Sequence, residues 1–253
     1  MSAVYSYAIT RAVTPAAMGD LRGVDGAPVR LVGIPPLWAV VTDVEMDEGN
    51  LRERLDSLSQ LEALARAHHS VVEAVAAQAT VIPLRLATIH SGDDSVADVL
   101  RRDRDRLVET LDRLAGRVEL GVKVYVRTAA AGTPRAAELE GSPTSGRDYL
   151  LRRRQQRDDR DEVWRRAVES AGHVDAVLST LAADRCHHGV QQIRLAGGPG
   201  GNVLNAAYLV DGQRVAEFTE RVHRLDRELT AVWIELTGPW PAYSFASGDE
   251  GAP

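Results

Sequence analysis

Histidines are the side chains of this sequence best suited to bind a metal or to move a proton near neutral pH. Four of the seven occur as adjacent pairs, His68-His69 and His187-His188. Neighbours in a helix point about 100° apart, so such a pair cannot hold one metal ion as residues spaced by four can. The histidines therefore predict no metal site.

Other patterns that could indicate catalysis are equally weak. The glycine-rich residues 197–202 join two predicted strands, whereas a phosphate-binding loop leads into a helix and ends in Lys and Ser or Thr. We interpret this stretch as a hairpin loop. No motif marks a serine or cysteine nucleophile, and no acidic pair has a diagnostic spacing. The sequence predicts no catalytic residue and no cofactor, and it indicates a protein that is not an enzyme.

Composition narrows the class of protein further. The 253 residues suffice for two domains, and 44 % hydrophobic with 26 % charged residues is typical of a globular protein. No apolar run approaches the roughly 18 residues that a membrane span needs. The net charge of −6 disfavours a general nucleic-acid binder, which needs clustered basic residues. We expect a cytoplasmic protein without nucleic-acid or membrane partners.

The first part of the chain predicts an N-terminal α+β domain over residues 1–116. Short runs rich in β-branched and aromatic residues predict strands, and apolar residues at steps of three and four predict helices. The expected strands are 4–9, 29–32, 37–42 and 81–85. The expected helices are 50–79, with a break near 57–60, and 93–114, capped by Asp93-Asp94-Ser95.

The second part predicts a ferredoxin-like domain over residues 117–238, followed by a tail, 239–253. The expected strands are 117–127, 190–195, 203–210 and 231–237, and the expected helices are 146–185 and 213–229. Residues 129–145 lack periodic apolar residues and predict a loop. The order βαββαβ is that of a split βαβ sheet with both helices on one face.

Three aromatic residues follow the last predicted strand, which should end at Gly238 because Pro239 and Pro241 lack a backbone N–H. Large rings in an irregular segment need a surface, either their own domain or a partner. Both interpretations remain open. We expect Trp240 to anchor the tail, and Tyr243 and Phe245 to be more exposed.

Several motifs resemble those of one known family, the gas vesicle protein F/L family. They are Gly238-Pro239-Trp240-Pro241-Ala242-Tyr243-Ser244-Phe245, Pro83-Leu84-Arg85-Leu86-Ala87-Thr88, Gly121-Val122-Lys123-Val124 and Asn205-Ala206-Ala207-Tyr208-Leu209-Val210. Two residues depart from the family pattern, Leu86 in place of Phe and Ala87 in place of Gly. The resemblance spans nearly the whole chain, in order.

The resemblance implies an accessory or minor structural protein of gas vesicles. Such a protein would be associated with the vesicles and bind the small hydrophobic shell protein and other accessory proteins. Arg85, Thr88, Trp240, Tyr243 and Phe245 are the candidate partner-binding residues, although Arg85 could instead pair with a buried carboxylate. The alternative class is a small-ligand binder or enzyme with a pocket between the two domains.

A basic helical stretch, 152–166, also has two interpretations. It holds seven arginines and four acidic residues. Ion pairs between neighbouring turns are typical of a solvated helix face, whereas a local positive charge on an acidic protein suits an acidic partner.

Overall fold

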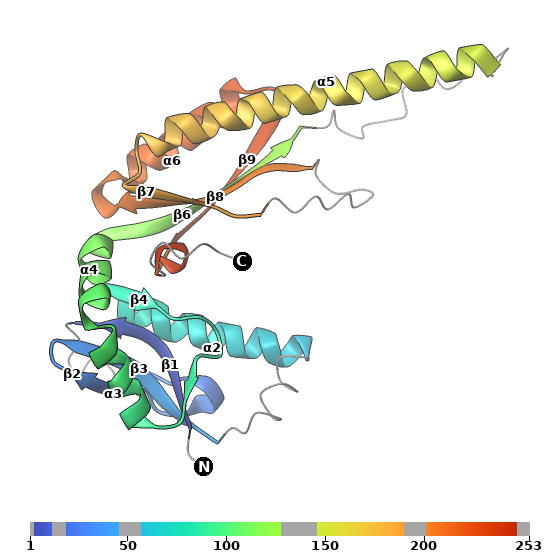
Figure 1. Cartoon of the computed structure of the whole chain (residues 1–253). Helices are drawn as coiled ribbons and strands as arrows, with labels where there is room; N and C mark the ends of the chain where they lie inside the picture. The colour runs from blue at the N-terminus through green and yellow to red at the C-terminus, as the bar shows by residue number, and fades with distance from the viewer. Residues whose placement is uncertain (1–2, 12–18, 46–56, 128–145, 190–200, 247–253) are drawn as a thin grey trace. The chain divides into compact units, whose positions relative to one another are not determined.

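The computed structural model describes residues 3–11, 19–45, 57–127, 146–189 and 201–246 (Figure 1). The chain forms two compact units, each described below by itself. Unit 1 comprises Met1–Glu119 and Trp240–Pro253, and unit 2 comprises Leu120–Pro239. Residues 240–246 therefore belong to the same unit as the N-terminal sheet.

Unit 1 contains a five-stranded sheet organised around β1, whose residues are all buried except Ala3. The sheet order is β2-β3-β1-β4, and β5 also pairs with β1. Every pairing is antiparallel, and Ile9 of β1 lies opposite both Ala39 and Ile82. The strands are β1 (Ala3–Thr10), β2 (Arg30–Ile34), β3 (Leu37–Val44), β4 (Val81–Pro83) and β5 (Ile89–His90).

Among the described residues of unit 1, three α-helices accompany this sheet: α2 (Leu58–Ala76), α3 (Asp93–Arg102) and α4 (Arg104–Leu114). Short 3-10 helices are η2 (Val24–Gly26) and η5 (Tyr243–Phe245). Helix α2 buries the side chains that its 3.6-residue period predicts, namely Leu64, His68, Val71, Val72 and Val75. All of these except His68 pack in the main core of unit 1 with Tyr5, Tyr7 and Val40.

The single helix predicted over 93–114 is wrong, because the chain breaks at Asp103. This residue closes α3 and opens α4, with φ −101° and ψ 15°. The stretch contains neither glycine nor proline, so the sequence carried no conventional stop signal. The predicted capping by Asp93-Asp94-Ser95 is also wrong, since Gly92 is the N-cap and no side chain caps the helix.

Unit 2 has the predicted ferredoxin-like arrangement. Its sheet has the order β7-β8-β6-β9, and α5 and α6 lie on one face of it (Figure 1). Between them is an apolar core that includes Leu120, Val174, Tyr208, Phe218 and Val232. The elements are β6 (Arg117–Val126), α5 (Gly146–Ser179), β7 (Asp184–His187), β8 (Asn202–Asp211), η4 (Gly212–Arg214), α6 (Val215–Glu228) and β9 (Val232–Trp240).

Two boundaries in unit 2 differ from the prediction. Helix α5 ends at Ser179, not at residue 185, because residues 184–187 form the strand β7 at the sheet edge. Strand β9 does not end at Gly238 but continues through Pro239 to Trp240. It is the other edge strand, and an edge strand tolerates a missing N–H because only one of its sides is paired. The predicted strand 190–195, the loop 129–145 and most of the glycine-rich loop 197–202 lie outside the described residues.

Within the described residues, no helix combines the length and the apolar character that crossing a bilayer requires.

Candidate partner-binding site

Helix α2 places a buried histidine in unit 1. His68 is 3 % exposed, and its Nδ1 lies 2.9 Å from the hydroxyl oxygen of Tyr5. Its Nε2 lies 3.1 Å from the backbone carbonyl oxygen of Leu84. The backbone N–H of Ala87 donates to the same Tyr5 oxygen at 3.1 Å. His68 and Tyr5 therefore connect α2 and β1 to the turn that follows β4.

These partners determine the protonation of His68. A carbonyl oxygen can only accept, so Nε2 carries the proton that it donates to Leu84. Burial lowers the pKa of His68 below its ordinary value of 6.5, which favours the neutral ring. Nδ1 then accepts from the Tyr5 hydroxyl. Because both ring nitrogens are engaged, His68 acts as a structural connector and not as a metal ligand.

Lowering the pH is expected to destabilise the fold through His68. Its pKa is lower in the folded protein than the ordinary 6.5, so below about pH 6.5 the unfolded state binds more protons. The free energy of unfolding should fall from there down to the pKa of folded His68, by at most about 1.4 kcal/mol per pH unit for this one proton. Urea unfolding at a series of pH values measures this slope.

Burial also lowers the pKa of His90, which acts in the same direction. The slope is therefore compared between His68→Gln and His90→Gln. We expect the larger reduction of the slope in His68→Gln, because its ring is the more deeply buried. A slope that stays at the wild-type value in His68→Gln would contradict this assignment.

The turn after β4 contains two of the residues that the sequence nominates. The Thr88 hydroxyl donates to the carbonyl oxygen of Arg85 at 2.7 Å, and the Thr88 N–H approaches the same oxygen at 3.3 Å. The hydroxyl and the backbone N–H of Thr88 thus both contact the turn itself. The Arg85 side chain is exposed, so it is not the buried member of an ion pair. Leu86, at 36 % exposed, also faces solvent.

Ala87 occupies the position of this turn that favours glycine. Its φ is +63°, in the left-handed region, where a Cβ costs about 1 kcal/mol. Ala87→Gly is therefore expected to raise the free energy of unfolding by up to about 1 kcal/mol, because the relief of strain exceeds the added chain entropy. Chemical denaturation measures the change. A destabilised Ala87→Gly variant would show that the turn does not strain the alanine.

The C-terminal segment is fastened to unit 1 by hydrogen bonds from two residues. Glu119 accepts from both the backbone N–H and the hydroxyl of Ser244, at 2.8 and 2.7 Å. The Arg113 guanidinium donates to the carbonyl oxygen of Phe245 at 2.6 Å. Phe245 is 3 % exposed, and Ala242 is buried as well. The 3-10 turn η5 is therefore a folded part of unit 1.

Rings from the two ends of the chain meet around α2. The Tyr243 ring lies 6.4 Å from His68 and 6.2 Å from His69, and the Trp240 ring lies 5.4 Å from His69, edge to face. Burial raises the pKa of Tyr243 to about 12, so its hydroxyl is protonated at neutral pH. We call Tyr5, Tyr7, His68, His69, Trp240 and Tyr243 the aromatic cluster.

The expected roles of the tail residues are reversed. Trp240 was expected to be the anchor, yet it is 41 % exposed, whereas Phe245, expected to be more exposed, is buried. The reason is that η5 turns Phe245 inward, whereas the Trp240 ring packs edge-on against His69 and keeps much of its surface exposed. The structure thus gathers Tyr243, Trp240 and the Arg85–Thr88 turn around the same stretch of α2, while Phe245 has an internal position.

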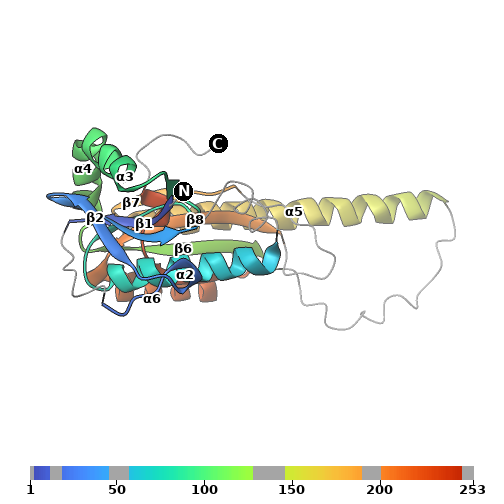
Figure 2. The ribbon, with the colours of Figure 1, turned by 90° about the horizontal axis from the view of Figure 1, so that it is seen from below.

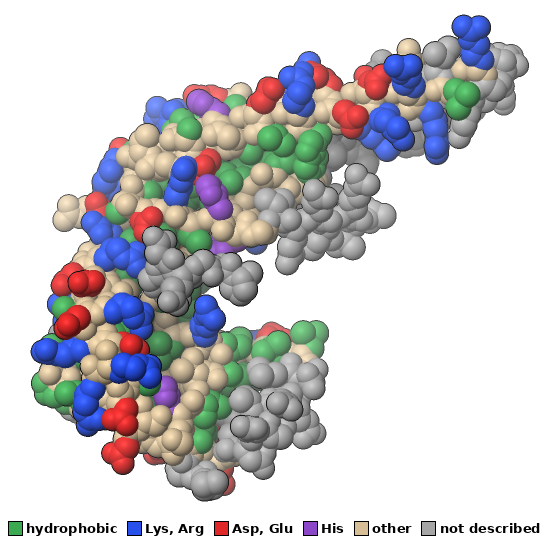
Figure 3. Space-filling view, viewed as in Figure 1, with side chains coloured by type: hydrophobic (Ala, Val, Ile, Leu, Met, Phe, Trp, Pro, Cys, Tyr) green, Lys and Arg blue, Asp and Glu red, His purple; other side chains and the backbone are tan. Residues whose placement is uncertain are grey.

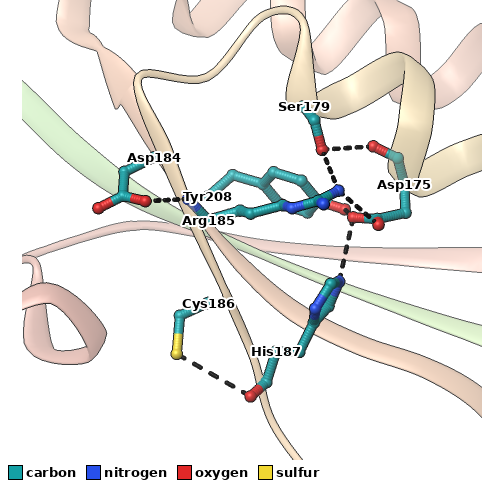
Figure 4. A network of polar contacts seen from close by, with 7 residues as sticks. All are labelled: Asp175, Ser179, Asp184, Arg185, Cys186, His187 and Tyr208. Carbon is teal, nitrogen blue, oxygen red and sulfur yellow. Dashed lines mark hydrogen bonds and ion pairs between the residues drawn. The ribbon is translucent and has the colours of Figure 1, made fainter. Parts of the chain in front are cut away.

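Unit 2 contains a separate group of polar side chains, centred on Asp175 of α5 (Figure 4). One carboxylate oxygen accepts from the Tyr208 hydroxyl at 2.7 Å and lies 3.2 Å from His187 Nε2. The other accepts from the Arg185 guanidinium at 2.7 Å. The Asp175 side chain is only 16 % exposed. Three residues of β7 and β8 therefore converge on one carboxylate.

The hydroxyl groups of this network are committed to hydrogen bonds. Burial, assisted by the bond to Asp175, raises the pKa of Tyr208, which keeps its hydroxyl protonated. The Ser179 hydroxyl donates to the Asp175 carbonyl at 2.6 Å and accepts from Arg185 at 2.8 Å. His187 lies on β7, and its Nε2 faces the Asp175 carboxylate. The network ties edge strand β7 to α5.

A groove of about 520 Å³ runs between α5 and α6 in unit 2. It is lined by Ala176, Val177, Thr180, Leu181, Glu217, Glu220, Arg221 and Arg224. Neither His68 nor Arg85 lines this groove, and His187 does not line it either. Over the described ranges, no three side chains of His, Cys, Asp or Glu are grouped so that they could hold a metal ion.

Two of the four motifs, residues 83–88 and 238–245, thus lie at or beside the aromatic cluster. Residues 3–247 match the family model described as "Gas vesicle synthesis protein GvpL/GvpF". The chain therefore belongs to the gas vesicle protein L/F family.

Individual relatives agree with this assignment. The chain is 43 % identical to gas vesicle protein L of Streptomyces sp. (strain CB03234), covering 96 % of this chain and 92 % of that protein. Its identity to gas vesicle protein F of the same strain is 27 %, covering 95 % of this chain and 98 % of that protein. The crystal structure of GvpF from Anabaena sp. PCC7120 has the same fold, with a TM-score of 0.68 at 20 % identity and coverage of 98 and 97 % of the two chains.

Proposed function

We propose that this protein is an accessory or minor structural protein of gas vesicles that binds the small hydrophobic shell protein and other accessory proteins during assembly. On this proposal it works through protein contacts and not as an enzyme. The observation that carries the proposal is an exposed tryptophan held on a folded segment: Trp240 is 41 % exposed, while Phe245, five residues later, is buried.

The geometry around Trp240 favours recognition of an apolar partner. The indole packs edge-on against His69 at 5.4 Å, which limits its movement while leaving much of its surface open to solvent. Partly ordered aromatic side chains lose little entropy on binding and are common binding hot spots. Leu86 and Arg85 of the neighbouring turn are exposed as well, and they add an apolar and a cationic group.

Membership of the family supports the choice of partner. A small apolar subunit that polymerises needs a soluble protein to hold or nucleate it, and ring packing on an exposed aromatic site is one way to do so. Thr88, Tyr243 and Phe245 then have indirect roles. Thr88 shapes the turn that presents Arg85, and Tyr243 and Phe245 hold the segment that presents Trp240.

The proposal is tested by co-purification and by gene deletion. Tagged protein should retain the shell protein from cells in which both are produced, and deletion of its gene should reduce the number of vesicles. If the tagged protein retained no shell protein and the deletion left vesicle formation intact, the proposal would be wrong.

A further inference from the structure

The N-terminal half of α5 extends beyond the sheet of unit 2 (Figures 1 and 2). The 34-residue helix is about 50 Å long, at 1.5 Å per residue. Among its described side chains, Ala167 is the first that is buried, and those before it are exposed or partly exposed. Roughly 30 Å of helix therefore lies ahead of the core of its own unit.

The buried face of α5 continues into this projecting part at the same spacing. Its buried members, at alternating steps of four and three, are Leu178, Val174, Ala171 and Ala167. Continued toward the N-terminus, the same steps reach Trp164, Arg160, Arg157, Arg153 and Leu150. We call Arg153, Arg157 and Arg160 the basic seam, and all three are exposed.

Apolar residues border the basic seam at both ends. Trp164 is 40 % exposed, and its ring lies so close to Gly201 that a Cβ there would be 2.8 Å from it. Leu150, at the other end, is 67 % exposed. Figure 3 shows basic side chains along the projecting helix and hydrophobic surface where it meets the rest of unit 2.

Residues at alternating steps of three and four are the positions on which a second helix packs in a coiled coil. A second copy of this chain would place arginine against arginine along the seam, which is unfavourable. Carboxylates at the facing positions would instead form charge-assisted pairs. The charge of the seam therefore selects an acidic helix.

We propose that the basic seam binds an acidic helical segment of another protein, with Glu or Asp facing the three arginines and apolar residues facing Leu150 and Trp164. Nucleic acid is a less favourable partner for the projecting part of α5 than an acidic helix. Asp158, Asp159 and Glu162 occupy other faces of the helix, where they would repel phosphate groups. The basic seam and Trp240 are different sites, so this inference can be tested independently of binding of the shell protein.

Two synthetic peptides of about three heptads test this inference with the full-length protein. The acidic peptide has Leu at the outer seam positions and Glu at the inner ones, and its counterpart has Lys in place of Glu. Fluorescence anisotropy of the labelled peptides gives the affinities at low and high salt. The test variant is R157E/R160E. The control, R165E/R166E, changes the net charge equally but lies on another face, where both arginines pair with Glu162.

The acidic peptide should bind the wild type and the control with similar affinity, and it should bind R157E/R160E about tenfold or more weakly. High salt should weaken its binding to the wild type by a similar factor. The lysine peptide should not bind. The inference is overturned if the acidic peptide fails to bind, if both variants weaken it equally, or if duplex DNA displaces it at lower concentration. A melting temperature many degrees lower in R157E/R160E than in the control would also overturn it, because the seam would then be covered by the protein's own chain.

Discussion

Replacing Phe245 with alanine is expected to lower the free energy of unfolding by roughly 3–5 kcal/mol, the usual cost of removing a buried phenylalanine side chain. Phe245 is 3 % exposed, and its backbone carbonyl is held by Arg113. The loss should therefore combine missing apolar burial with loosening of η5. Guanidinium unfolding monitored by circular dichroism measures the change.

Trp240→Ala is the matched control for this prediction. Because Trp240 is 41 % exposed, its replacement should change the free energy of unfolding by no more than about 1 kcal/mol. Equal losses in the two variants would contradict the division between a buried anchor and a presented ring. The same result would remove the basis for placing partner binding at Trp240.

Asp175→Ala is expected to destabilise the protein by roughly 2–4 kcal/mol, because several hydrogen-bonding groups lose their partner together. The Tyr208 hydroxyl and the Arg185 guanidinium each lie 2.7 Å from the carboxylate that is removed. Tyr208 is fully buried, so its hydroxyl has no access to water as a substitute. Thermal and urea unfolding measure the effect.

Ser179→Ala serves as the control within the same network. It removes one hydroxyl and leaves the Asp175 carboxylate in place, so the expected cost is about 1 kcal/mol or less. An Asp175→Ala variant as stable as Ser179→Ala would mean that the network is not what ties β7 to α5.

Periodicity was sufficient to predict much of the fold. The helix α6 buries Phe218, Val222 and Leu225, the residues that its steps of three and four pick out. The alternation of β6 likewise predicts its inward side chains, Leu120, Val122, Val124 and Val126. These elements are predictable because each has one face toward an apolar core, so its buried residues recur at a regular spacing along the sequence.

Elements whose partners are distant in sequence were less predictable. Strand β7 is polar and mostly exposed, so it shows no apolar alternation, and antiparallel pairing with residues 206–209 of β8 places it in the sheet. The burial of Phe245 depends on η5, which Glu119 and Arg113 hold from residues more than a hundred positions earlier. No local pattern signals a contact of this kind.

The candidate site, too, was predictable where a local sequence pattern existed and not where contacts join distant residues. The motifs indicated which stretches to examine, and Trp240, Tyr243 and the Arg85–Thr88 turn do border the same stretch of α2. His68 and Tyr5 connect them, yet neither was nominated, because a histidine in an apolar helical stripe gives no signal of its hydrogen-bond partners. The available signal was the apolar stripe of α2, which places the His68 ring in the core. There, its nitrogens need buried hydrogen-bond partners.

The most direct test of the central claim is the affinity of purified shell protein for the wild type and for Trp240→Ala, measured side by side with their stabilities. If Trp240 presents the binding surface, the variant should bind at least about 2 kcal/mol, or roughly thirtyfold, more weakly while its melting temperature stays within a few degrees of the wild type. Unchanged affinity in a folded Trp240→Ala protein would contradict the claim.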